Sequence, residues 1–213
     1  MVDARLITAI KADPREPNLR KIQSGSKVIG RIRRQDVESL QLAVHDELDA
    51  SMLDAIAACA RRVALRLRAI RSLSRAAASR QRLATRLAPH ADNFEQVTTI
   101  LDELEQDGLL DDAAAADQIA QEVIRRGPIG TYKLTAMLRS RGFAGDLSRS
   151  VAAKYLDDRD ELADAMEAAQ KAARGLDRLP PETARRRLIG RLARKGFSAS
   201  VVRETVERML SRD

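Results

Sequence analysis

Basic side chains recur at one position in this sequence, and their spacing could let them bind an anionic surface. Arg82, Lys133 and Arg187 each stand directly before a leucine that is followed by a second leucine four residues later. Residues at i, i+4 and i+8 lie on one face of a helix, so each of these cations begins a largely basic stripe. With the cations around them they form the candidate binding set: Arg82, Arg86, Lys133, Arg139, Arg141, Arg187, Arg191, Arg194 and Lys195. His90 and Met137 fill the two stripe positions that hold neither arginine nor lysine.

Charge is also segregated along the chain. Residues 61–86 contain nine arginines and no acidic residue, and residues 185–195 contain six basic residues and no acidic one. Residues 92–112, in contrast, contain eight acidic residues and no basic one. Two interpretations remain open: neighbouring helices pair through salt bridges and expose a solvated face, or the basic faces recognise an anionic surface.

The residue types that usually carry catalysis or bind metal ions are scarce. The two histidines, His45 and His90, lie in unrelated regions, and Cys59 is the single cysteine. No H-E-x-x-H, G-x-S-x-G, Walker or dinucleotide-binding glycine motif occurs. Asp111 and Asp112 are adjacent at a predicted helix start, where carboxylates cap the helix rather than face each other. We therefore predict a protein that is not an enzyme and that uses no cofactor and no metal ion.

The composition is typical of a helical, highly charged protein. Of 213 residues, 32% are charged, 44% are hydrophobic and only 2% are aromatic, which favours helix over strand. The net charge of +7 fits either a well-solvated surface or a partner that is a polyanion or has an acidic face. The scarcity of aromatic residues argues against single-strand binding by base stacking. Without an 18-residue apolar run or a signal-peptide pattern, we expect a cytoplasmic protein with no membrane contact, and we expect a monomer.

The first 50 residues differ from the rest of the chain. Residues 5–11, 19–25 and 27–33 are short runs rich in isoleucine and valine, separated by segments with proline or glycine. This pattern predicts a small antiparallel hairpin or meander, followed by a short helix across "RQDVESLQL". A segment of this size buries little surface, so we expect it to pack against the helical part or a partner.

From about residue 50 the apolar residues recur at helical spacing. In the third helix, for example, the predicted apolar stripe comprises Phe94, Val97, Ile100, Leu101 and Leu104. Nine helices are predicted, at residues 50–76, 79–88, 93–108, 111–127, 131–142, 145–156, 159–176, 180–196 and 198–210.

These helices form a threefold repeat. The strings "KLTAMLRSRGF" and "RLIGRLARKGF" match each other, and "RLATRLAPHAD" is a weaker copy. Their first leucines, Leu83, Leu134 and Leu188, lie 51 and 54 residues apart. We expect the leucines to face the core, the glycine to adopt the left-handed cap conformation and the phenylalanine to fill the gap to the third helix.

The expected fold is mostly α, with three tandem three-helix repeats in an elongated array after a small β-rich N-terminal segment. The expected domains are residues 1–50 for the β-rich module and 51–110, 111–157 and 158–213 for the three repeats.

The segment from "ILDELEQDGLLDDAAAADQIAQEVIRRGPIGTYKLTAMLRSRGF" to "RRRLIGRLARKGF" resembles the RecX regulatory proteins, which modulate the bacterial RecA recombinase. The resemblance covers about residues 55–212. The matching residues are Leu104, Gly108, Leu110, Asp111, Asp112, Gly127, Leu134, Leu138, Gly142, Phe143, Leu188, Leu192, Gly196 and Phe197.

The resemblance implies a regulator without enzymatic activity and a fold of three tandem three-helix units. It implies RecA and the RecA–DNA filament as partners, with depressed ATP hydrolysis and strand exchange, in recombination, DNA repair and the SOS response. The basic stripes could meet phosphates, including those of DNA alone, or acidic residues of RecA.

Two other classes remain as alternatives. Three-helix units with short turns also resemble helix-turn-helix modules, so the protein could be a DNA-binding transcription regulator that acts without RecA. It could also be an inert scaffold whose charges only solvate it.

Overall fold

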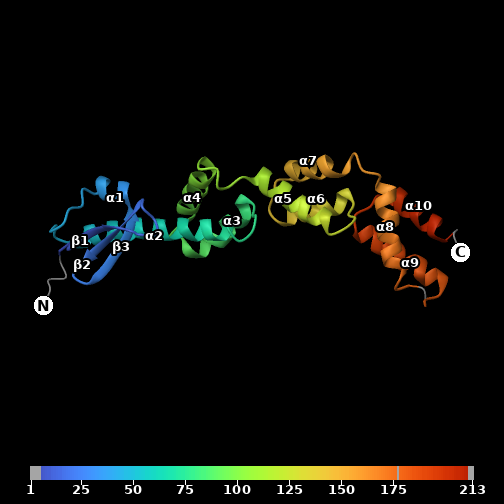
Figure 1. The fold of residues 1–213 in the computed structure, drawn as a ribbon, viewed down its shortest axis with the longest axis horizontal. Helices are drawn as coiled ribbons and strands as arrows, with labels where there is room; N and C mark the ends of the chain where they lie inside the picture. Colours follow the sequence, from blue (N-terminus) through green and yellow to red (C-terminus); the bar gives the residue numbers. More distant parts are fainter. Residues whose placement is uncertain (1–5, 177, 211–213) are drawn as a thin grey trace. The chain divides into compact units, whose positions relative to one another are not determined.

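The computed structural model describes residues 6–176 and 178–210, which form two units. Unit 1 comprises Met1–Arg75 and Ala84–Leu109, and unit 2 comprises Ala76–Leu83 and Leu110–Asp213. Three strands lie in the N-terminal part of the chain, and helices follow (Figure 1). Helix α3, Arg80–Leu87, begins in unit 2 and ends in unit 1.

The strands form an antiparallel meander in the order β1-β2-β3, as predicted. Gly25, with a φ of +59°, makes the tight turn between β2 and β3. The first strand begins later than predicted, because the backbone before it forms only an isolated bridge at Leu6. Residue 5 of that predicted strand lies outside the described residues. The strands are β1, Ala9–Ala12; β2, Leu19–Ser24; and β3, Lys27–Arg33.

The sheet packs on the first long helix, so the N-terminal segment shares a core with the helical part. A short helix, α1, spans Arg34–Ser39, and α2 spans Ala50–Leu73. A Cβ on Gly30 of β3 would lie only 2.5 Å from Cγ2 of Ile56 on α2, so glycine permits this close approach. The shared core contains Ile7, Ile22, Ile32, Leu42, Leu48 and Ile56.

Unit 1 ends with the 3₁₀ helix η1, Ala88–His90, and helix α4, Phe94–Gln106. The prediction that Phe94 belongs to the apolar stripe is wrong, because its side chain is 74% exposed. It is the first residue of α4, and the buried face begins one turn later. The other members of the stripe are buried as predicted: Val97, Ile100, Leu101 and Leu104.

Unit 2 contains two groups of three helices. Asp111 caps α5 as predicted, and Pro181 is the first residue of α9. After residue 50 the described part of the chain thus holds nine α-helices, each at a predicted position. The first group is α5, Asp112–Arg125; α6, Thr131–Ser140; and α7, Gly145–Leu156. The second group is α8, Glu161–Ala173; α9, Pro181–Arg194; and α10, Ala199–Leu210.

Each group in unit 2 has its own hydrophobic core. Gly142 and Gly196 have φ values of +87° and +84°, so both adopt the predicted left-handed conformation at a helix end. The first core includes Leu134, Leu138, Phe143, Val151 and Leu156. The second includes Leu188, Leu192, Phe197, Val202 and Val206.

Candidate anion-binding surface

The nine candidate cations lie on α3, α6 and α9 or directly after these helices, which are the middle helices of the three predicted repeats. The leucines beside them, such as Leu134 and Leu188, are buried. The stripes therefore run along the solvent side of each core face. Arg141 and Arg191 are half-buried. The seven exposed cations are Arg82, Arg86, Lys133, Arg139, Arg187, Arg194 and Lys195.

The first stripe is shorter than predicted. Helix α3 ends at Leu87, and His90 belongs to the following 3₁₀ helix. Because the number of residues per turn changes there, the i, i+4, i+8 relation from Arg82 does not continue to His90. The stripe on α3 therefore consists of Arg82 and Arg86.

Three of the five arginines of α2 pair with acidic residues in or beside α4. The Arg61 Nε–Asp92 Oδ2 distance is 2.9 Å, and the Arg66 Nη2–Asp107 Oδ2 distance is 2.5 Å. Arg62 also forms an ion pair with Glu103. The salt-bridge interpretation of charge segregation thus holds for the first part of the Arg-rich stretch.

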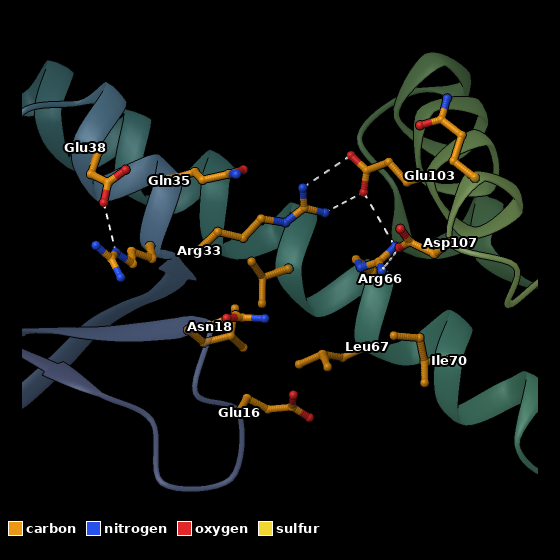
Figure 2. Close-up of a pocket in the computed structure, with 14 residues that line it drawn as sticks. Glu16, Asn18, Arg33, Gln35, Glu38, Arg66, Leu67, Ile70, Glu103 and Asp107 are labelled. Atoms are coloured by element: carbon orange, nitrogen blue, oxygen red, sulfur yellow. Dashed lines mark hydrogen bonds and ion pairs between the residues drawn. The ribbon is translucent and has the colours of Figure 1, made fainter.

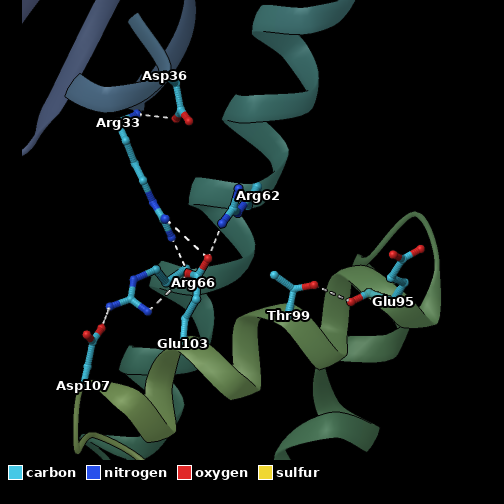
Figure 3. A network of polar contacts seen from close by, with 8 residues as sticks. All are labelled: Arg33, Asp36, Arg62, Arg66, Glu95, Thr99, Glu103 and Asp107. Carbon is cyan, nitrogen blue, oxygen red and sulfur yellow. Dashed lines mark hydrogen bonds and ion pairs between the residues drawn. The ribbon is translucent and has the colours of Figure 1, made fainter. Parts of the chain in front are cut away.

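Glu103 is the centre of this network, which also includes Arg33 from β3 (Figure 3). Burial raises the pKa of Glu103, but hydrogen bonds and positive charges from Arg33 and Arg62 lower it by more. The pKa therefore lies below its ordinary value of 4.5. The network borders a hollow of about 660 Å³, whose lining has both acidic and basic residues (Figure 2). We interpret these mixed charges as a structural link between the sheet and α4.

The nine candidate cations lack such acidic partners. Within residues 6–176 and 178–210, none of their side chains forms an ion pair, and three donate to neutral oxygens. Their positive charge is therefore available to an anionic partner. The three hydrogen bonds join Arg86 to Ser72 Oγ (2.9 Å), Arg191 to the Ala172 carbonyl (2.6 Å) and Lys195 to the Pro128 carbonyl (2.8 Å).

Unit 2 brings the backbone at the ends of different basic stripes into contact. The Lys195 carbonyl accepts from the backbone N–H of Gly130 at 2.9 Å, directly before the helix that carries Lys133. The Ser79 hydroxyl accepts from the N–H of Arg82 at 3.1 Å and donates to the Arg141 carbonyl at 2.6 Å. Stripes that are separate in the sequence therefore meet at their ends in the structure.

Comparisons with known proteins identify the family. Residues 159–206 match the third three-helix domain of RecX. The regulatory protein RecX of Chromobacterium violaceum is 34% identical over 143 residues, which cover 67% of this chain and 88% of that protein. The chain belongs to the RecX family.

Other RecX proteins support the same conclusion. That of Mycobacterium avium is 35% identical over 141 residues, covering 64% of this chain and 79% of that protein. A crystal structure of regulatory protein RecX has a TM-score of 0.74 at 21% identity and covers 95% of this chain and 99% of that chain. RecX from Lactobacillus salivarius has a TM-score of 0.61 at 16% identity, over 72% and 98% of the two chains.

In this RecX chain the acidic pair and the cysteine occupy structural positions. Asp111 accepts two backbone N–H groups of the first turn of α5, at 2.8 and 3.0 Å. Asp112 accepts the backbone N–H of Arg80 at 2.7 Å.

Burial raises the pKa of the Cys59 thiol, which keeps it protonated and weakly nucleophilic. The part of the chain that the structure describes contains no group of three or more His, Cys, Asp or Glu residues able to hold a metal ion.

The exposed residue that sequence reasoning missed is Tyr132, whose side chain is 73% exposed in the first turn of α6, beside Lys133. An aromatic residue in an amphipathic helix is usually buried, so its position gave no signal of exposure.

None of the helices in the described residues combines the length and apolar character needed to cross a membrane.

Proposed function

We propose that this protein binds the RecA–DNA filament and inhibits RecA ATPase and strand exchange, and so limits recombination and repair. The observation that carries the proposal is the set of nine cations on α3, α6 and α9, which have no acidic partner among the described residues. Membership of the RecX family, whose members are named regulatory proteins, supports a protein partner, and the family resemblance favours RecA.

The physical basis is electrostatic complementarity. A nucleoprotein filament presents regularly spaced phosphates and acidic side chains, and exposed cations attract both. Seven exposed cations on three helices provide several weak contacts at once, and such contacts combine into tight binding when they engage together.

The test is a titration of RecA ATPase activity on single-stranded DNA. The unmodified protein inhibits the activity, and the triple variant Arg82→Glu, Lys133→Glu, Arg187→Glu inhibits it at least about tenfold less, because each change replaces attraction by repulsion. Its melting temperature changes little, because exposed charge substitutions usually alter stability by less than about 0.5 kcal/mol.

A matched control reverses the same number of charges away from the middle helices. Arg68, Arg149 and Arg203 are exposed cations on α2, α7 and α10, and their triple glutamate variant is expected to inhibit normally. Equal loss of inhibition in both triple variants would show that net charge alone causes the effect. Normal inhibition by a destabilised stripe variant would show that the stripes serve stability instead.

A second assay separates the proposal from the transcription-regulator alternative. Binding to random-sequence DNA is measured with and without RecA. We expect RecA to strengthen binding, whereas a transcription regulator binds a specific duplex without RecA.

A further inference from the structure

The end of α9 rests directly on the backbone at the start of α6. Gly196 has a φ of +84°, and a Cβ on it would lie 2.3 Å from the nitrogen and 2.4 Å from the Cβ of Lys133. The nearest atoms belong to the backbone or to Cβ, so no flexible side chain can move aside. Glycine is therefore required here both for its φ and for its lack of a side chain.

A related contact, with side-chain atoms instead of backbone, joins the end of α6 to the start of α3. Gly142 has a φ of +87°, and a Cβ on it would lie 2.7 Å from the Ser79 hydroxyl oxygen. Ser79 and Gly130 stand at equivalent positions, each directly before the first turn of its middle helix. We call the contacts of Gly142 with Ser79 and of Gly196 with Gly130 and Lys133 the glycine joints.

Ending a helix does not by itself require such contacts. Gly108 and Gly127 also follow helices and have positive φ values of +68° and +135°, yet a Cβ on either would meet nothing within 4 Å. The glycine joints thus have a second role that these two glycines lack.

Each glycine joint brings together the backbones of residues that carry cations on two helices. Lys195 precedes Gly196, which rests on Lys133, and the backbones of Arg141 and Arg82 meet at the Ser79 hydroxyl. The joints therefore fix the spacing between the basic stripes of two successive middle helices, so that one partner surface can engage both stripes at once.

We propose that Gly142 and Gly196 are positioning residues for partner binding: they join the basic stripes of successive middle helices into one continuous surface, which the filament contacts as a whole. The proposal rests on the proposed function for its partner. The joint itself can be measured without RecA.

The test compares Gly196→Ala with Gly127→Ala, whose φ of +135° strains alanine at least as much but which has no close neighbour. The chain has only seven lysines, so a Lys133–Lys195 link made by an amine-reactive crosslinker is readily identified by mass spectrometry. The unmodified protein and Gly127→Ala form the link. Gly196→Ala loses it and binds the RecA–DNA filament roughly tenfold more weakly, because contacts that acted together are separated.

A second pair of variants covers the case in which Gly196→Ala does not fold. A Cβ at residue 142 would meet the Ser79 hydroxyl most closely and Gln81 at 3.1 and 3.2 Å, so the double variant Gly142→Ala, Ser79→Gly removes the closest collision. Glycine costs little as an N-cap, but Ser79→Gly also removes the donor to the Arg141 carbonyl. The single variant Ser79→Gly is therefore measured beside the double variant. Gly142→Ala alone weakens filament binding, and the double variant restores part of it.

Several outcomes would overturn the proposal. One is full filament affinity in Gly196→Ala although the crosslink is lost, and another is that Gly196→Ala keeps the crosslink. The others are that Gly127→Ala weakens filament binding as much as Gly196→Ala does, or that the double variant binds no better than Gly142→Ala. If the unmodified protein does not bind the filament, the proposed function fails and the role in binding fails with it. The crosslink then still shows whether the joint exists.

Discussion

Phe143 and Phe197 occupy equivalent positions, each directly after the glycine that ends a middle helix. Both side chains are buried, at 4% and 5% exposure, and each packs in the core of its own three-helix group. Phe94 and Tyr132, in contrast, lie in the first turns of their helices and are exposed. Among these aromatic residues, only the two after the glycines are placed to stabilise a core.

We expect Phe143→Ala and Phe197→Ala each to lower the free energy of unfolding by about 3–5 kcal/mol, because each leaves a cavity in a small core. Phe94→Ala is the control and costs less than about 0.5 kcal/mol. Urea denaturation followed by circular dichroism measures all three. A loss below about 1 kcal/mol for either buried ring would show that the ring does not support its core.

Glu103→Gln tests the charge network between β3, α2 and α4. Hydrogen bonds to charged groups contribute about 1.5–3 kcal/mol each when buried, and Glu103 is partly exposed, so we expect a loss of roughly 1–2 kcal/mol at pH 7. The lowered pKa of Glu103 gives the sign of the pH dependence. Its contribution is complete above the ordinary pKa of 4.5 and is lost as the pH falls through the lower pKa of the folded state.

The control for this experiment is Glu95→Gln, which removes the same charge from the same helix at an exposed position. Melting temperatures are measured from pH 7 to pH 3. The difference between Glu103→Gln and the unmodified protein should shrink on acidification. Glu95→Gln removes only the favourable interaction of a first-turn carboxylate with the helix dipole, about 0.3–1 kcal/mol, so its difference should be smaller at pH 7. A constant difference would mean that ionisation of Glu103 does not stabilise unit 1.

At the scale of the elements, the first and third middle helices each differ from α6 at a glycine joint. The first middle helix has Ala91 where the others have the joint glycine. The last middle helix begins at Pro181, one turn earlier relative to its first leucine than α3 and α6 do. By leucine spacing Ala184 corresponds to Ser79, but it lies inside α9. The first and third repeats of this sequence therefore each have only one half of a glycine joint.

Sequence patterns predicted the elements well, because the information for them is local. Leucine spacing placed every middle helix, and short runs rich in isoleucine and valine, separated by a Gly-Ser turn, placed β2 and β3. The contact between Gly142 and Ser79 and the ion pair between Arg33 and Glu103 join residues more than 60 positions apart. No local pattern encodes such pairings, so the sequence showed which cations could act but not which of them meet.

Ser79→Ala is a test of the first joint at this scale. The substitution removes the N-cap of α3 and leaves the Arg141 carbonyl without its donor, so we expect a loss of about 1–3 kcal/mol. Ser140→Ala, at an exposed position in α6, should cost less than about 0.5 kcal/mol. Thermal unfolding of both variants measures the difference, and equal stabilities would show that the Ser79 hydroxyl is not needed.

At the scale of the whole molecule, the positive charges behind the net charge of +7 differ between the two units in whether they have acidic partners. In unit 1 the arginines of α2 are largely offset by the acidic residues around α4. Eight of the nine candidate cations belong to unit 2, where none of them has an ion-pair partner among the described residues. The binding free energy is therefore expected to depend on salt through the cations of the middle helices rather than through the net charge.

The salt dependence of filament binding measures this directly. When cations neutralise phosphates, the logarithm of the binding constant falls linearly with the logarithm of the salt concentration, with a slope of about 0.7–0.9 per phosphate. We expect the triple variant Arg82→Gln, Lys133→Gln, Arg187→Gln to have a slope shallower by about one for each residue changed. The matched variant Arg68→Gln, Arg149→Gln, Arg203→Gln loses the same charge elsewhere and should keep the original slope. The two triple variants thus have equal net charge and differ only in the position of the changes. Identical salt slopes in the two variants would contradict phosphate contact by the stripes. A shallower slope in the stripe variant alone would locate the contact on α3, α6 and α9.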